Sequence, residues 1–308
     1  MNMLEGMHLG KQSLMKSDYV KIASYMFLDK YRKEREGDAP GVIYNKFITL
    51  LHSDLKLRKI DIKLPHCWYR WGDIVVGYCV PYVHWNHDQP NYTTVKWIGD
   101  EVPAYESNDE VISLIKKNMT EFMLRHKGSD AHETAKDEVY DGAPFDFQKD
   151  YKKLRESLDS MSKRTVMNNS SEYLAGLFYP TMENFPKNEF KNILNEKEKF
   201  EAVFKMGLES NVSPKDLYDL TEYFWYFFCY HLRLHKKCNE NIPANTLAIW
   251  KEEIPWETQK MEQILQNFAE KLTLGNSNNH LVISLLEDRE KRIERLDVLT
   301  SKLCDDET

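Results

Sequence analysis

Apolar residues recur at three- and four-residue steps along most of the chain, and this spacing predicts amphipathic helices. The first helix covers about 17–37 and the second about 42–55. Pro65 suits the first turn of a third helix, which Pro81 would end. The inward face of this third helix would carry Trp68, Trp71, Val75 and Tyr78.

Two aromatic and β-branched runs, 82–85 and 92–97, flank a polar turn and predict a β-hairpin. Three helices followed by a hairpin is the order of elements in a winged-helix domain, which is a variant of the helix-turn-helix. We therefore expect a winged-helix-like domain over residues 17–100.

The remainder of the chain is predicted to be helical. Connecting helices and a polar linker are expected over 101–170, in which the stretch 127–149 is polar with Gly and Pro and predicts a linker or mobile loop. The periodic segments there and in a helical domain over 171–305 are 108–125, 149–163, 171–178, 186–209, 214–237, 244–273 with interruptions at Pro243 and Pro255, and 277–303. The expected fold class is mainly α: an N-terminal winged-helix-like domain with one β-hairpin, followed by a C-terminal helical domain.

Composition is that of a folded cytoplasmic protein. The chain has 308 residues, of which 42% are hydrophobic and 12% aromatic, and no stretch approaches a bilayer span. The start has no secretory pattern, and five irregularly spaced cysteines indicate reduced thiols.

The net charge of −7 is unevenly distributed. Residues 1–100 hold 14 Lys and Arg against 11 Asp and Glu (+3), residues 101–170 hold 11 against 14 (−3), and residues 171–308 hold 17 against 24 (−7). A mildly basic front permits contact with nucleic acid through that part of the chain only.

Two groups of Cys and His residues are candidates for a metal site. The first consists of Cys67, Cys79, His84 and His87, whose spacing lacks the Cys-x2-Cys pair typical of zinc sites. The second consists of Cys229, His231, His235 and Cys238, which follow an aromatic run typical of a buried helix. We expect buried thiols in the first group and a core helix with a basic end in the second, with no metal and no cofactor.

No residue pattern indicates catalysis. The chain contains no Gly-x-Ser-x-Gly, no Gly-x4-Gly-Lys-Ser/Thr and no Gly-x-Gly-x-x-Gly. The alternative to a binding protein is a metal-dependent or nuclease-like effector enzyme that uses one of the two Cys/His groups.

Polar residues of the third helix and the hairpin are the candidate contacts to DNA or to a protein partner. A winged helix offers its third helix to the major groove and its hairpin to a neighbouring groove or to the backbone. The expected contact residues are Lys63, His66, Arg70, His87, Asn91 and Lys96.

The last predicted helix, 277–303, has an apolar stripe opposite dense mixed charge. Leu286, Ile293, Leu296 and Leu303 fit core positions of a heptad, whereas Arg289 and Thr300 do not. This helix is a candidate for homodimerisation, and the alternative is a helix that packs within the chain.

The sequence LPHCWYRWGDIV, residues 64–75, resembles uncharacterised archaeal and bacterial proteins that have a winged-helix-type front, and it is distantly similar to the Panacea antitoxin domain. That domain has an aromatic-Gly-Pro-Val element where this chain has Asp73-Ile74 after its glycine. The resemblance covers at most residues 18–100. It implies a regulatory protein that binds a toxin or another partner, and it assigns no catalytic residue.

Overall fold

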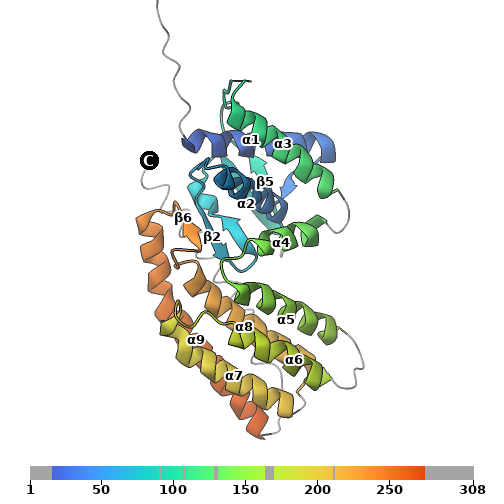
Figure 1. The fold of residues 1–308 in the computed structure, drawn as a ribbon, viewed down its shortest axis with the longest axis vertical. Coiled ribbons are helices and arrows are strands. Elements are labelled where there is room, and N and C mark those ends of the chain that lie inside the picture. The colour runs from blue at the N-terminus through green and yellow to red at the C-terminus, as the bar shows by residue number, and fades with distance from the viewer. Residues whose placement is uncertain are drawn as a thin grey trace, which may run out of the picture. The chain divides into compact units, whose positions relative to one another are not determined.

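The computed structural model describes residues 16–89, 92–106, 108–127, 131–163, 170–210 and 212–274. These residues are mainly helical, as the sequence predicts (Figure 1). The chain folds into two compact units: unit 1 consists of Met1–Leu64 and Val80–Ala131, and unit 2 consists of Pro65–Cys79 and His132–Thr308. The backbone therefore leaves unit 1 after Leu64, contributes a short segment to unit 2, and returns to unit 1 at Val80.

Unit 1 combines helices with a small antiparallel sheet. The strand order in the sheet is β1–β5–β4, so the first strand lies beside the last, and Ala39 lies opposite Val95. The elements of unit 1 are α1 (Lys16–Arg35), β1 (Ala39–Pro40), α2 (Gly41–Leu57), β4 (Val83–Gln89), β5 (Tyr92–Trp97) and α3 (Glu110–Arg125).

An aromatic core joins the three helices of unit 1. The rings of Phe27 on α1 and Phe47 on α2 stack with their centroids 4.4 Å apart, and Phe122 on α3 contacts both rings. The hydroxyl groups of Ser24 and Tyr44 share a hydrogen bond of 2.8 Å within this buried layer. The apolar spacing that predicted α1, α2 and α3 thus corresponds to a core that they share.

Unit 2 is a helical bundle with a second three-stranded sheet of order β3–β2–β6. Its elements are β2 (His66–Tyr69), β3 (Gly72–Val75), the 3-10 helix η1 (Gly77–Cys79), α4 (Ala131–Asp141), α5 (Asp146–Ser162), α6 (Ser170–Glu183), the 3-10 helix η2 (Lys191–Ile193), α7 (Leu194–Glu209), α8 (Pro214–Leu232), β6 (Asn239–Glu240) and α9 (Ala244–Leu274).

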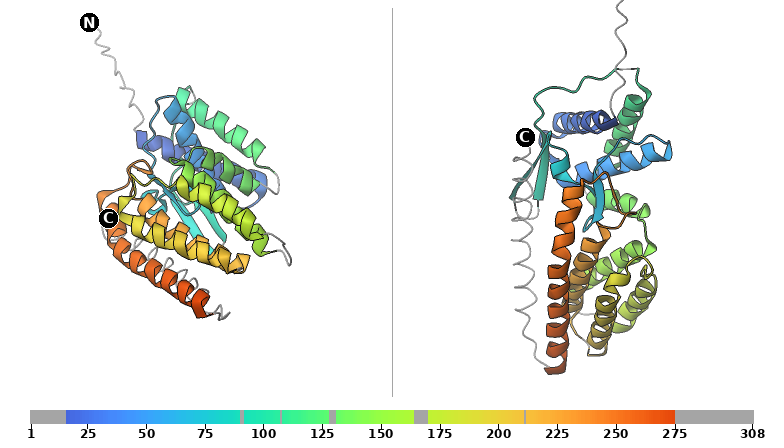
Figure 2. Two further views of the ribbon diagram at one scale, coloured as in Figure 1. Left: turned by 60° about the horizontal axis from the view of Figure 1, so that its bottom comes forward. Right: turned by 90° about the vertical axis from the view of Figure 1, so that its left-hand side faces the viewer.

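Helix α8 is the centre of unit 2. Every residue from Asp219 to Leu232 is buried, which confirms the prediction of a helix that is apolar all round. Helices α5, α7 and α9 pack against α8, and α6 contacts both α5 and α7 (Figure 2). Among the described helices, neither α8 nor any other is both long and apolar enough to cross a membrane.

The predicted third helix of the N-terminal domain is wrong. Residues 66–75 form the β2–β3 hairpin, in which His66 lies opposite Val75 and Tyr69 lies opposite Gly72. The two-residue turn Arg70–Trp71 leads into Gly72 with φ 96°, a left-handed conformation that glycine adopts without steric cost. The tryptophan spacing fitted a helix, but the glycine and the aromatic residues favour a hairpin.

Two further predictions in the helical part are corrected. The stretch 127–149 is not a loop throughout, because α4 forms within it and buries Ala135, Val139 and Tyr140. Helix α9 also continues through Pro255 without the predicted interruption there. The predicted helix 277–303, with its proposed dimer contact, lies outside the described residues.

The two units divide the chain differently from the expected segments 17–100, 101–170 and 171–305. Contiguous segments were expected, whereas the hairpin of residues 66–75 belongs to unit 2 although residues on both sides of it belong to unit 1. No change in composition marks the two places, after Leu64 and before Val80, where the chain passes between the units. Long-range pairing of this hairpin with β6 determines its membership of unit 2.

We expect Gly99→Ala to lower the free energy of unfolding by about 1–3 kcal/mol. A Cβ atom at Gly99 would lie 2.4 Å from Cζ2 of Trp97, whose indole folds back over the glycine. Urea unfolding of the variant and of the wild type measures the difference. Gly142→Ala is the matched control, since the nearest atom to its Cβ is a carbonyl oxygen at 3.5 Å. Equal effects of the two substitutions would contradict the expectation.

Candidate functional site

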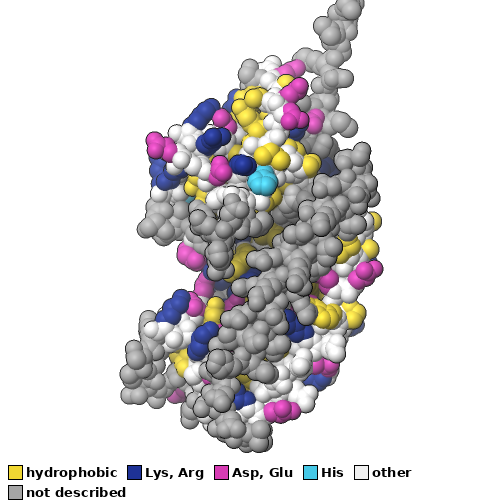
Figure 3. Space-filling model, turned by 180° about the vertical axis from the view of Figure 1, so that it is seen from behind, with side chains coloured by type: hydrophobic (Ala, Val, Ile, Leu, Met, Phe, Trp, Pro, Cys, Tyr) yellow, Lys and Arg dark blue, Asp and Glu magenta, His cyan; other side chains and the backbone are white. Residues whose placement is uncertain are grey.

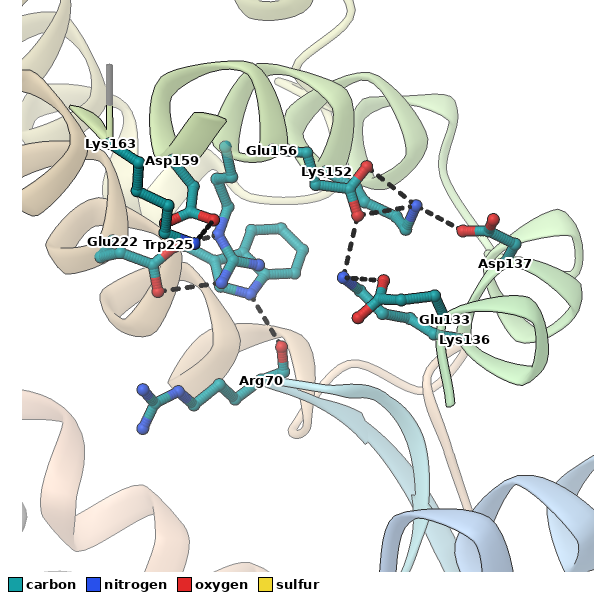
Figure 4. Close-up of polar contacts among 11 residues, drawn as sticks. Arg70, Glu133, Lys136, Asp137, Lys152, Glu156, Asp159, Lys163, Glu222 and Trp225 are labelled. Atoms are coloured by element: carbon teal, nitrogen blue, oxygen red, sulfur yellow. Dashed lines mark hydrogen bonds and ion pairs between the residues drawn. The ribbon is translucent and has the colours of Figure 1, made fainter. Parts of the chain in front are cut away.

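The β2–β3 hairpin carries three of the residues singled out in the sequence, His66, Cys67 and Arg70, and unit 2 holds this hairpin firmly. The Trp225 Nε1–H on α8 donates to the carbonyl oxygen of Arg70 at the hairpin turn (3.1 Å; Figure 4). The backbone N–H of Trp68 donates to the carbonyl oxygen of Cys238 (2.7 Å). The hairpin is therefore anchored both to α8 and to the segment around Cys238 that follows α8.

His66 is buried and is held by two carboxylates. Its Nδ1 donates to Asp73 Oδ1 at 2.7 Å, and its Nε2 lies 3.8 Å from Glu240 Oε2. Burial lowers the pKa of His66, but the charges of Asp73 and Glu240 and the hydrogen bond with Asp73 outweigh it and raise the pKa to about 9. His66 is an imidazolium at neutral pH, and the prediction that it faces outward as a contact residue is wrong.

Three arginines of unit 2 lie against aromatic rings. Arg155 on α5 forms a two-point ion pair with Glu222 on α8, both side chains are buried, and the Arg155 Cζ atom lies 5.3 Å from the Trp225 ring centroid. Glu222 holds the pKa of the Arg155 guanidinium above its usual value despite burial. Arg70 stacks over Tyr226 and Trp71, with its Cζ atom 3.7 and 4.5 Å from the ring centroids.

Arg233, just after α8, completes this group. It pairs with Glu253 of α9, and its Cζ atom lies 4.5 Å from the Tyr230 ring and 4.7 Å from the Trp250 ring. Arg233 and Arg155 are thus neutralised by carboxylates of neighbouring helices. These contacts fix the helices of unit 2, because an unpaired buried charge is strongly unfavourable.

A second polar network joins α4 to α5. Lys152 Nζ lies 2.6 Å from Asp137 and 2.9 Å from Glu156, and Lys136 Nζ lies 2.8 Å from Glu156 (Figure 4). Burial opposes the charge of Lys152, but its hydrogen bonds with Asp137 and Glu156 raise its pKa. This network stabilises the helix that replaces the predicted loop.

The structure does not assemble the first predicted Cys/His group. Cys67 and Cys79 belong to unit 2, whereas His84 and His87 lie on β4 in unit 1. Cys67 is instead near Cys229 and Cys238 of the second group, as their mutual electrostatic influence indicates. Burial raises the pKa of the Cys67 and Cys238 thiols well above the usual range, so both are protonated and inert as nucleophiles at neutral pH.

The two histidines of the second group have different partners. His231 is buried, and its Nδ1 accepts a hydrogen bond from the Asn192 amide at 3.0 Å. Burial and the charge of Arg233 lower the pKa of His231 to about 4, so this side chain is neutral at pH 7. The prediction that it contributes to a basic end of α8 is therefore wrong. His235 Nε2 instead lies 3.0 Å from Glu189 Oε2.

The remaining predicted contact residues belong to unit 1. Lys96 on β5 is exposed and lies directly opposite exposed His84 on β4. Lys63 is also exposed, and its Nζ lies 2.6 Å from Asp61. Asn91 and the side chain of His87 lie outside the described part of the chain.

Exposed basic residues gather at the carboxyl end of α2. Lys56, Arg58 and Lys59 are exposed there, together with Leu57, whose side chain is 85% exposed. Arg58 pairs with Asp54 one turn earlier in the helix. On the face drawn in Figure 3, Lys and Arg side chains lie among Asp and Glu side chains, so the charge there is mixed.

The chain matches no model of a protein family, no curated protein and no solved structure.

One surface feature was missed in the sequence. Residues 98–106, IGDEVPAYE, connect β5 to α3 and expose Ile98, Val102 and Tyr105 among acidic residues. The signal was present as a run of acidic and apolar residues around Pro103. It has no helix or strand period, however, so a periodicity analysis assigns it no role.

We expect Glu222→Gln to destabilise the protein by about 3–5 kcal/mol, because it leaves the buried Arg155 without its counter-charge. Urea unfolding monitored by tryptophan fluorescence measures the loss. Asp29→Asn, which breaks the exposed Lys33–Asp29 pair, is the control and should cost less than about 1 kcal/mol. A similar decrease in the free energy of unfolding in both variants would show that the Arg155–Glu222 pair contributes no more than an exposed ion pair.

The contribution of His66 to stability should decrease as the pH rises. The folded pKa of about 9 lies above the ordinary 6.5, so the stabilisation is complete below about pH 6.5 and is lost on the way to pH 9. The difference corresponds to about 3 kcal/mol at most. Unfolding free energies of wild type and His66→Gln between pH 6 and 9.5 should converge with rising pH, and a constant gap would disprove this.

Proposed function

We propose that the chain is a non-enzymatic regulatory binding protein, and that unit 1 is a winged-helix-like domain that contacts a protein partner. The strand order β1–β5–β4 supports this proposal, since a winged helix likewise pairs the strand after its first helix with the second strand of its hairpin. Helices α1 and α2 contact β5 in unit 1. In this comparison β4 and β5 form the wing.

The wing presents its polar face to solvent. His84 and Lys96 lie side by side on it, one on each strand, and both are exposed. Cross-strand neighbours of this kind are close enough to act together on one group of a partner. They are the described residues of the wing that we assign to partner contact.

A protein partner fits unit 1 better than DNA does. The helix that would read the major groove is missing from the described part of unit 1, because the chain enters unit 2 after Leu64 and forms the β2–β3 hairpin there. Unit 1 also exposes Leu57, Val102 and Leu124, which are large apolar residues of the kind that protein interfaces bury.

DNA is the second candidate, and the basic end of α2 favours it. Lys56, Arg58, Lys59 and Lys63 are exposed within eight positions and supply phosphate-contact chemistry. Asp54 and Asp61 already pair with two of these residues, which reduces the positive potential at this end. Contacts to phosphate alone would bind DNA without reading its sequence.

The alternative of a metal-dependent effector enzyme gains no support from the Cys/His groups. The four residues of the first group are divided between the two units. The buried thiols of Cys67 and Cys238 remain protonated, because burial raises their pKa values. His231 serves as a hydrogen-bond acceptor for Asn192. These residues stabilise unit 2.

We expect His84→Glu/Lys96→Glu to weaken binding of the partner at least tenfold, because two carboxylates then replace the polar pair that includes the positive charge of Lys96. The full chain is used to capture a partner from its native host, and the dissociation constant is then measured calorimetrically with the purified partner. Lys251→Glu on α9 is the control, since Lys251 is also exposed. An unchanged dissociation constant for the wing variant would show that the wing does not contact the partner.

A titration with duplex DNA at several salt concentrations tests the second candidate. If DNA is the ligand, Lys59→Glu/Lys63→Glu should lower the slope of log K against log salt by about 2. Absence of any salt-dependent binding by the wild type would leave the protein partner as the function of unit 1.

A further inference from the structure

The segment between β5 and α3 is an unusual surface of unit 1. Residues 98–106, called the acidic-apolar segment below, run as an irregular connection between the two elements (Figure 2). A connection of this kind would ordinarily expose polar residues and turn formers. This one exposes large apolar side chains instead.

The start of the segment is fixed to the core of unit 1. The Trp97 Nε1–H donates to the carbonyl oxygen of Gly99 at 3.0 Å, and the Ile98 N–H donates to the carbonyl oxygen of Tyr82 at 3.1 Å. The Trp97 ring contacts the rings of Tyr25 and Tyr82, each at a centroid distance of 5.4 Å. These contacts hold the first residues of the segment in one conformation.

The end of the segment is fixed as well. The Asp109 N–H donates to the carbonyl oxygen of Glu106 at 3.2 Å, and the Asp109 carboxylate caps α3 by accepting from the Val111 N–H at 2.7 Å. The Tyr19 hydroxyl on α1 donates to the same carboxylate at 2.9 Å. The Tyr105 ring lies 5.0 Å from Lys116 Nζ on α3.

Between these two ends, apolar and acidic side chains point outward together. The exposed fractions are 47% for Ile98, 64% for Val102 and 37% for Tyr105. Asp100, Glu101 and Glu106 are exposed beside them. Asp100 and Glu101 are exposed, and no ion pair joins either carboxylate to another residue in the described part of the chain.

We propose that the acidic-apolar segment is the docking surface for a basic segment of a protein partner that also carries apolar side chains. The proposal rests on the function proposed for unit 1 and names the chemistry of its partner. Burial of Val102 and its apolar neighbours supplies favourable free energy, and the carboxylates select lysine and arginine. Because both ends are fixed, little conformational entropy is lost on binding.

The charge of the segment argues against two other occupants. Nucleic acids and anionic membranes both present phosphates, which Asp100, Glu101 and Glu106 would repel. A basic protein segment is attracted by the same three carboxylates. The basic end of α2 is a separate surface with the opposite charge, and the proposal does not use it.

The test uses the full chain and the purified protein that it captures from its native host. Asp100→Lys/Glu101→Lys should raise the dissociation constant at least tenfold. Val102→Ser should raise it several-fold without changing any charge. Glu198→Lys/Glu252→Lys is the matched control, because it makes the same charge change at exposed positions of unit 2. Circular dichroism checks that all three variants fold.

A photo-reactive amino acid at position 102 identifies what lies over the segment. The cross-linked peptide of the captured protein should carry a net positive charge and apolar residues, and its yield should fall with rising salt. An acidic cross-linked peptide, or full affinity in both segment variants, would overturn the proposal while the partner function stands. If the wild type captures no protein and binds DNA, the partner function fails, and this proposal fails with it.

Discussion

From Asp219 to Leu232, helix α8 has no side that faces solvent, so the rest of unit 2 has to cover this part on every side. Apolar cover is not sufficient for its run of aromatic residues, because Trp225 brings an indole N–H into the core that needs an acceptor. The turn of the β2–β3 hairpin supplies that acceptor. This hydrogen bond to α8 and the pairing of β2 with β6 together explain why a segment from the N-terminal third of the chain belongs to unit 2.

Sequence periodicity identified the elements that depend on local spacing. Helices α1, α2, α3 and α8 and the β4–β5 hairpin all lie close to their predicted positions. Periodicity failed at residues 66–75, where Trp68, Trp71 and Val75 satisfy a helical repeat and a hairpin almost equally. Pairing of β2 with β6 decides between the two structures, and no local pattern contains that information.

The candidate site was harder to predict than the fold, and the reasons are physical. His66 was expected to be an exposed contact, yet it is buried, and the two carboxylates beside it belong to Asp73 and to the distant Glu240. Cys67 was grouped with its neighbours in sequence, yet the charge of Arg233 and the thiol of Cys229, both from the other half of the chain, also act on its thiol. Lys96 and Lys63, whose exposure follows from local structure alone, lie on the surface as expected.

The hydrogen bond between Trp225 and Arg70 joins residues 155 positions apart, and this separation sets an order of assembly. During synthesis, the hairpin leaves the ribosome long before α8 and β6 exist to receive it. Until then its strands lack the α8 and β6 partners that they have in the folded protein. Residues of unit 1 precede and follow the hairpin in the sequence. Closure of the long loop between Arg70 and Trp225 is slow, and it therefore limits how early the whole chain becomes native.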